Sequence, residues 1–116
     1  MGGTRPLSVI ALEQVRIGIV TVLYNSENVL EDFFRTLDRQ TYRDFSLYVI
    51  DNHSPDNSLD RARELAATVR FRTEIIAEPE NWGVAKGNNI GIVRALAEGC
   101  EYVLLSNNDI VLEPDT

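Results

Sequence analysis

Short apolar runs alternate with helical patterns along the chain. The runs are rich in β-branched residues, as buried strands are, and they fall at residues 16–24, 45–52, 72–78 and 101–106. Between the runs, apolar residues recur at the three- and four-residue spacing of amphipathic helices, at residues 28–40, 57–69 and 84–98. This alternation predicts right-handed βαβ units and a parallel sheet that is covered on both faces. We therefore expect a three-layer α/β/α fold with a mainly parallel sheet.

The spacing of apolar residues also predicts which helix faces are buried. In the first helix the expected core positions are Leu30, Phe33, Phe34 and Leu37. In the third helix they are Ile90, Val93, Leu96 and Ala97. Gly99 directly follows that helix, at a position where a residue in the left-handed conformation commonly ends a helix.

The chain divides into a tail and one domain. Residues 1–15 hold one apolar stretch that is too short for a signal-peptide core or a membrane span, so we expect a flexible tail. Residues 16–116 then form the domain. Four strands and three helices make about half of a typical nucleotide-dependent transferase, and we therefore expect a truncated fold of that kind.

Composition and charge narrow the possible partners. A hydrophobic content of 44% excludes a disordered chain. The formal charge of −7 should repel nucleic acid and anionic lipid, so we expect no nucleic-acid partner. Cys100 is the only cysteine and allows no internal disulfide, which fits a reducing compartment. We expect a cytoplasmic location, which includes the inner face of the membrane, and no transmembrane segment.

Polar residues gather directly after each predicted strand, at residues 24–28, 51–57, 78–83 and 106–109. The carboxyl ends of parallel strands share one edge of the sheet, where ligands bind. The sequence therefore predicts a polar cleft with at least three carboxylates. The same residue types are also typical of turns and helix caps. In that interpretation Asn25 or Ser26 caps the first helix, and Asp56 or Asn57 caps the second.

Asp109 is the strongest candidate for phosphate chemistry. The sequence contains neither the P-loop nor the dinucleotide glycine fingerprint, which favours metal-assisted phosphate binding over a glycine-rich cradle. Mg²⁺ and Mn²⁺ take oxygen ligands, and in nucleotide sites one or two carboxylates plus substrate phosphates often suffice. Asn107 offers a carbonyl oxygen beside Asp109. A solvated turn is the alternative interpretation of these residues.

Three stretches, residues 20–58, 81–91 and 102–109, resemble in order and spacing the donor-binding half of the inverting family 2 glycosyltransferases. The similarity extends over about residues 17–113 and is greatest to rhamnosyltransferase-like members. The resemblance implies the GT-A fold, a UDP- or dTDP-sugar donor and a Mg²⁺ or Mn²⁺ cofactor. It also implies a glycan or lipid-linked saccharide as acceptor, in cell-wall or polysaccharide biosynthesis.

The resemblance assigns roles by position in these motifs. It implies donor contacts at Thr21, Tyr24, Asn25, Glu27, Asp51, Asn52, Ser54, Asn81, Gly83, Lys86, Asn89 and Asn108. Asp51 matches the position where a carboxylate accepts a hydrogen bond from the base. The triplet at residues 107–109 corresponds to the metal-binding D-x-D, with Asn107 in place of the first aspartate. Because this change removes one ligand charge, Asp109 is expected to carry most of the metal binding.

Two expectations concern single side chains near the third helix. Lys86 is the best-placed local cation for phosphate, with a solvated helix lysine as the alternative. Trp82 is expected to pack the loop before the helix, with a place in the donor pocket as the alternative.

Sugar transfer also requires an Asp or Glu base for the acceptor hydroxyl. None of residues 1–109 is placed for that role, and only Glu113 and Asp115 follow. In the family that the chain resembles, the base lies in the second half of the domain. We therefore expect no catalytic residue in this chain, and donor binding without turnover.

Two other functions share this topology. Sugar-nucleotide nucleotidyltransferases usually carry a glycine-rich loop with an arginine after the first strand, and residues 24–28 have neither. Receiver-like, non-catalytic nucleotide-binding or regulatory modules need paired acids after that strand, where this chain has Tyr24 and Asn25. The donor-binding part of a sugar transferase is the leading hypothesis.

Overall fold

The structure is a computed structural model that describes residues 15–109. The expected tail therefore lies almost wholly outside the described residues, as do Glu113 and Asp115. In chain order the elements are β1 (Ile17–Leu23), η1 (Glu27–Val29), α2 (Leu30–Asp38), β2 (Phe45–Asp51), α3 (Ser58–Ala66), β3 (Arg72–Ala77), α4 (Val84–Ala97) and β4 (Tyr102–Leu105). Every predicted strand and helix is present. The first predicted helix begins with the short 3₁₀ turn η1, and the second ends at Ala66, three residues before the predicted end at residue 69.

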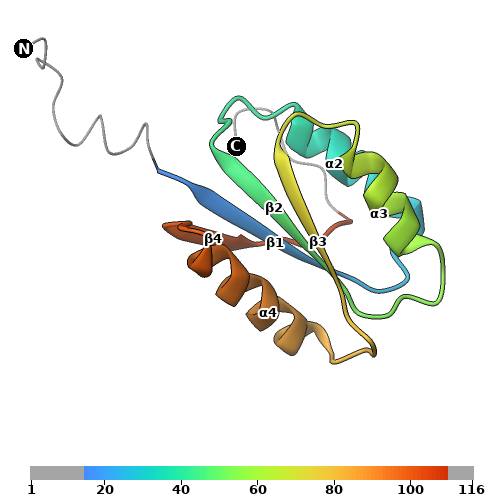
Figure 1. Ribbon diagram of the computed structural model, residues 1–116. Coiled ribbons are helices and arrows are strands. Elements are labelled where there is room, and N and C mark those ends of the chain that lie inside the picture. The colour runs from blue at the N-terminus through green and yellow to red at the C-terminus, as the bar shows by residue number, and fades with distance from the viewer. Residues whose placement is uncertain (1–14, 110–116) are drawn as a thin grey trace, which may run out of the picture.

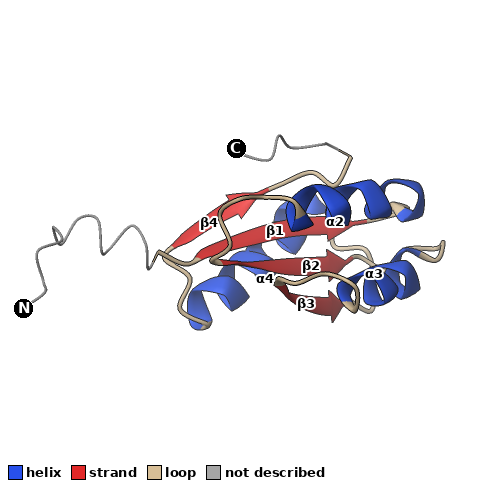
Figure 2. Cartoon of the chain, turned by 90° about the horizontal axis from the view of Figure 1, so that it is seen from above, coloured by secondary structure: helices blue, strands red, loops and turns tan. Residues whose placement is uncertain are grey.

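The strands form one four-stranded sheet in the order β3-β2-β1-β4, and all three pairings are parallel. In the register of the sheet, Val20 of β1 lies between Tyr48 of β2 and Leu105 of β4. Helices α2 and α3 cover one face and α4 covers the other (Figure 1), and the view from above shows all four strands pointing the same way (Figure 2). The predicted three-layer α/β/α fold is confirmed, and the carboxyl ends of the strands share one edge.

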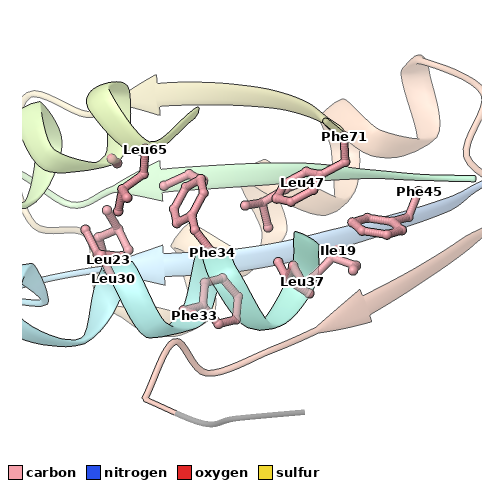
Figure 3. Packing of buried hydrophobic residues seen from close by; sticks show 12 residues of the cluster. Ile19, Leu23, Leu30, Phe33, Phe34, Leu37, Phe45, Leu47, Leu65 and Phe71 are labelled. Carbon is pink, nitrogen blue, oxygen red and sulfur yellow. The ribbon is translucent and has the colours of Figure 1, made fainter. Parts of the chain in front are cut away.

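The larger core lies between the sheet and the helices α2 and α3. All four predicted core positions of the first helix are fully buried there: Leu30, Phe33, Phe34 and Leu37. Phe71, which precedes β3, joins them, with its ring centroid 6.2 Å from that of Phe34 and 5.0 Å from that of Phe45 (Figure 3). Aromatic rings packed in this way stabilise the core beyond the effect of the apolar area that they bury, and they hold α2 against the sheet.

The prediction for the buried face of α4 is wrong for three of its four residues. Val93 is 67% exposed, Leu96 is 55% exposed and Ala97 is also exposed, while Ile90 packs partly against the core. The buried residues are the small ones, Gly87, Gly91 and Ala95. A Cβ atom on Gly91 would lie only 2.3 Å from Cγ1 of Val20. Close approach of the helix backbone to the sheet therefore requires the small residues to face inward, and the larger apolar residues lie outside.

The end of α4 agrees with the sequence. Gly99 has a φ of +92°, in the left-handed region that glycine favours, so the predicted helix stop is confirmed. Cys100 follows as a buried core residue. Among residues 15–109, no helix combines the length and the apolar character that a membrane span requires.

Candidate functional site

A hollow of about 450 Å³ lies at the carboxyl edge of the sheet. It is lined by Val22, Tyr24, Ser26, Asn52, Asn81, Gly83, Val84, Asn107, Asn108 and Asp109. Seven of these residues are among the predicted site residues, and they come from the ends of β1, β2 and β4 and from the loop before α4. Among the described residues, Asp109 is the only carboxylate in this lining, and no lysine or arginine takes part. The expected cleft with at least three carboxylates is therefore not what the described residues form.

The carboxylate of Asp51 is occupied within its own turn. Asp51 is 3% exposed, and its oxygens accept hydrogen bonds from the Ser54 hydroxyl at 2.6 Å and from the Ser54 backbone N–H at 3.3 Å. The Ser54 hydroxyl oxygen in turn accepts the backbone N–H of Asn25 at 3.2 Å. Asp51 and Ser54 thus join the loops that follow β1 and β2. Neither residue lines the hollow, and contact between Asp51 and a base stays a prediction.

A second set of hydrogen bonds joins the same two loops. Asp56 accepts the hydroxyl of Ser58 at 2.5 Å and its N–H at 3.0 Å through one carboxylate oxygen, and the N–H of Glu27 at 3.2 Å through the other. The Glu27 carboxylate accepts the N–H of Asn57 at 3.2 Å, and the Ser58 hydroxyl oxygen accepts the N–H of Ser26 at 2.7 Å. Glu27 therefore supports the loops and does not line the hollow.

The surroundings of Asp56 lower the pKa of its carboxyl group. Burial on its own raises the pKa of the Asp56 carboxyl, but the hydrogen bonds from Ser58 and from the backbone of Glu27 outweigh it, so the pKa lies below its ordinary value. These bonds favour the charged form. The N-cap residue of α3 is Asn57, and its side chain makes no capping bond. Asp56, the other predicted cap, lies one residue earlier and accepts the N–H of Ser58, the first residue of the helix. The side chain of Ser26, by contrast, makes no capping bond to η1.

The turn after β4 is held against β1 by Asn108. Its side-chain amide donates hydrogen bonds to the hydroxyl of Thr21 at 3.1 Å and to the carbonyl of Val22 at 2.9 Å. Thr21 is fully buried, so it takes part in this anchor instead of lining the hollow. Asn107 and Asp109 flank the anchor, and both are exposed at the hollow. The structure thus holds the Asp109 turn at the end of β1.

The loop before α4 is fixed by two asparagines. The side-chain amide of Asn52 donates to the carbonyl of Gly83 at 3.0 Å, and the side-chain oxygen of Asn81 accepts the N–H of Gly83 at 2.9 Å. Gly83 has a φ of +88°, a conformation that side chains with a Cβ atom rarely adopt. The buried side-chain oxygen of Asn52 has no hydrogen-bond partner among residues 15–109. This asparagine therefore positions the start of α4 and keeps one acceptor free beneath the hollow.

Two of the predicted donor residues lie elsewhere. Lys86 and Asn89 line a separate groove of about 540 Å³ between α4 and β3, which Ile76 also lines. The ammonium nitrogen of Lys86 lies 4.0 Å from the centroid of the Trp82 ring, as in a cation–π contact. The Trp82 indole N–H donates to Glu78 at 3.0 Å. Trp82 therefore packs the loop, and the structure does not bring Lys86 into the hollow.

The sequence motifs assign no role to two polar residues beside the hollow, although Ser106 lies in the polar stretch at residues 106–109. Asn88 and Ser106 line a smaller adjoining pocket of about 150 Å³, together with Val22, Val84 and Asn107 among others. Asn88 follows the buried Gly87 and lies four residues after Val84. Asn88 therefore lies one helical turn after Val84 and beside the glycine that faces the sheet. This spacing is the sequence signal that points to Asn88.

A metal ion at this edge would depend on few protein ligands. Within the described part of the chain, no three His, Cys, Asp or Glu side chains cluster in a way that could hold an ion. Asp109 and Asn107 remain as adjacent oxygen ligands on the hollow. A hard cation bound by one carboxylate and one amide oxygen needs further oxygens from a ligand or from water.

The structure is a parallel α/β domain with a polar hollow at the carboxyl edge of its sheet. Glycosyl transferase family 2 matches residues 18–116, and the chain belongs to this family. Its domain is that of a glycosyltransferase. Comparison with curated proteins found no match.

Several solved structures share the fold. The mannosyltransferase PcManGT from Pyrobaculum calidifontis, in complex with GDP-Man and Mn²⁺, has a TM-score of 0.73 and 23% identity; the match covers 83% of this chain and 28% of that chain. S. aureus TarS has a TM-score of 0.77 and 21% identity, with 88% of this chain and 18% of that chain covered. A TarS 1–349 structure in complex with UDP-GlcNAc has a TM-score of 0.72 and 21% identity, with 82% of this chain and 27% of that chain covered. The chain thus spans less than a third of each structure.

Proposed function

We propose that this domain binds the nucleotide-diphosphate-sugar donor of a glycosyltransferase, with Asp109 and Asn107 holding Mg²⁺ or Mn²⁺ beside the diphosphate. The observation that carries the proposal is the composition of the hollow. Within residues 15–109, its polar lining consists of amide and hydroxyl groups, with Asp109 as the single charged side chain. Family membership supports a sugar nucleotide as the ligand. The complex of PcManGT with GDP-Man and Mn²⁺ supports a divalent cation.

Electrostatics favours the cation. A diphosphate brings negative charge to a chain of formal charge −7, at an edge where the hollow offers no lysine or arginine. When bound, a divalent cation offsets this repulsion and stabilises the charge that grows on the leaving diphosphate. Asp109 and Asn107 supply oxygen ligands, and donor phosphates and water complete the set.

The other residues divide into contacts and supports. Tyr24 is 49% exposed at the hollow and offers a flat ring to the nucleoside. Asn52, Asn81 and Asn108 offer amides beside it. Thr21, Asn25, Glu27, Asp51 and Ser54 act on donor binding through the loops that they hold. We assign no donor contact to Lys86 or Asn89, because both lie on the separate groove.

We further propose that transfer proceeds with inversion to a glycan or lipid-linked saccharide, in a rhamnosyltransferase-like reaction of cell-wall or polysaccharide synthesis. The reaction is placed on the cytoplasmic side, at or near the inner face of the membrane. The acceptor base is assigned to a residue outside 15–109. Of the carboxylates in this range, only Asp109 lines the hollow, and it is assigned to the cation.

The test is a titration of UDP, dTDP and GDP against the purified chain, with Mn²⁺ or with EDTA. The expected result is binding that requires Mn²⁺ and that is lost in Asp109→Ala. Asp32→Ala removes the same charge from an exposed position on α2 and serves as the matched control. Circular dichroism verifies that both variants are folded. Equal affinity in EDTA, or in Asp109→Ala, would refute the metal site.

A further inference from the structure

A smaller pocket adjoins the hollow beside the first turns of α4, and we call it the α4 pocket. Its volume is about 150 Å³, against about 450 Å³ for the hollow. The two cavities share Val22, Val84 and Asn107. The remaining lining residues of the α4 pocket are Asn88, Leu105 and Ser106. The α4 pocket therefore borders the hollow along these three residues.

The lining of the α4 pocket is neutral and amphipathic. Of the described lining residues, three are apolar and three carry amide or hydroxyl groups, and none is ionisable. Amides and hydroxyls both donate and accept hydrogen bonds, as the hydroxyl groups of a sugar do, while apolar side chains suit the C–H surface of a sugar ring. Within residues 15–109, no hydrogen bond occupies the side-chain amide of Asn88. The Ser106 hydroxyl donates to the carbonyl of Asn107 at 3.1 Å, so its oxygen is left as an acceptor.

We infer that the α4 pocket receives the sugar ring of the donor, and that it selects a neutral sugar over one that carries a carboxylate. The inference rests on the proposed function, which places the diphosphate beside Asn107 and Asp109. From that position the sugar reaches the α4 pocket, because Asn107 belongs to both cavities.

The preference for a neutral sugar follows from charge. The carboxylate of a hexuronate would enter a pocket that has no lysine or arginine among its described lining residues. Moving an unpaired carboxylate out of water is costly. A neutral hexose avoids this cost.

The inference is tested by comparing nucleoside diphosphates with sugar nucleotides in calorimetric titrations with Mn²⁺. One set is UDP, UDP-glucose and UDP-glucuronate, and the parallel set is GDP, GDP-mannose and GDP-mannuronate. The variants are Asn88→Ala and Ser106→Ala. Val93→Ala is the control, because residue 93 is on the same helix but 67% exposed and lines the other groove.

Each variant of the α4 pocket should weaken the neutral sugar nucleotide roughly three- to tenfold, the effect of one lost hydrogen bond, and leave the nucleoside diphosphate unchanged. Val93→Ala should change neither. The wild-type chain should bind the hexuronate donor more weakly than the hexose donor. Equal affinity for hexose and hexuronate donors would overturn the selectivity, and equal loss of diphosphate and sugar nucleotide would overturn the pocket assignment. If no nucleoside diphosphate binds at all, the proposed function fails first and the inference fails with it.

Discussion

The contact between Gly91 of α4 and Val20 of β1 predicts that one added methyl group destabilises the domain. A Cβ atom at residue 91 would lie 2.3 Å from Cγ1 of Val20 and 3.0 Å from its Cγ2. Val20 is fully buried, and its β-branched side chain has little freedom to rotate away. Gly91→Ala therefore forces α4 away from the sheet or forces Val20 into a strained rotamer.

Two opposing effects set the magnitude for Gly91→Ala. Alanine is favoured over glycine inside a helix by about 1 kcal/mol. Overpacking a well-filled core costs about 1–3 kcal/mol. Because the nearest approach of 2.3 Å is to a buried and stiff neighbour, the upper part of that range applies. We expect a net loss of about 1–2 kcal/mol in the free energy of unfolding, opposite in sign to what helix propensity alone predicts.

Urea unfolding followed by far-UV circular dichroism measures this change. The midpoint should fall while the slope stays constant, because the native state remains equally compact. In a Val20→Ala background the two nearest methyl groups are gone and only the Cβ atom of residue 20 stays close, at 3.2 Å. Gly91→Ala should there destabilise the domain much less, with a coupling energy that identifies the contact. A Gly91→Ala variant as stable as the wild-type chain would refute the packing argument.

Three further predictions concern the loops and the site. The lowered pKa of Asp56 contributes stability that is full above the ordinary aspartate pKa of about 4 and is lost as the pH falls through the lower folded value. Asp56→Asn should therefore flatten the pH dependence of urea midpoints below about pH 4. Asn108→Ala removes the bonds to Thr21 and Val22 and should weaken Mn²⁺-dependent nucleotide binding roughly three- to tenfold in calorimetry, while the chain stays folded. Tyr48→Phe removes the hydroxyl that donates to Glu98 at 2.8 Å and should cost about 1 kcal/mol in urea unfolding; an unchanged midpoint would contradict a role for that bond.

The sequence predicts the sheet and the α2 face well, because their signals are hydrophobic. Leu30, Phe33, Phe34 and Leu37 are large, recur at helical spacing and are all buried. On α4, the distance between helix and sheet decides which residues are buried. There the close approach of backbone to sheet selects glycine and alanine at every fourth position, and hydrophobicity is a poor guide to burial because the inward residues are the smallest ones.

The location of the hollow is also predictable, because the carboxyl ends of parallel strands must meet. Which acidic residues face it is not predictable. Glu27, Asp51 and Asp109 all lie at or just after the end of a strand and look alike in the sequence. The difference arises from hydrogen bonds between loops that are about 30 residues apart, such as that from the Asn57 N–H to Glu27, and no local pattern reports these bonds.

The carboxylates that hold the loops together are poorly suited to bind a metal ion. A carboxylate that satisfies backbone N–H groups is a poor ligand for a metal ion, since coordination would leave those donors unpaired at a cost of about 1–3 kcal/mol each. Glu27, Asp51 and Asp56 are all engaged in this way, and Asp109 is the carboxylate at the hollow that makes no such bond with another residue of 15–109. In a cleft with several free carboxylates, a neighbour could replace a lost ligand. Here no other carboxylate among residues 15–109 lines the hollow, so the loss of Asp109 alone should abolish metal-dependent binding.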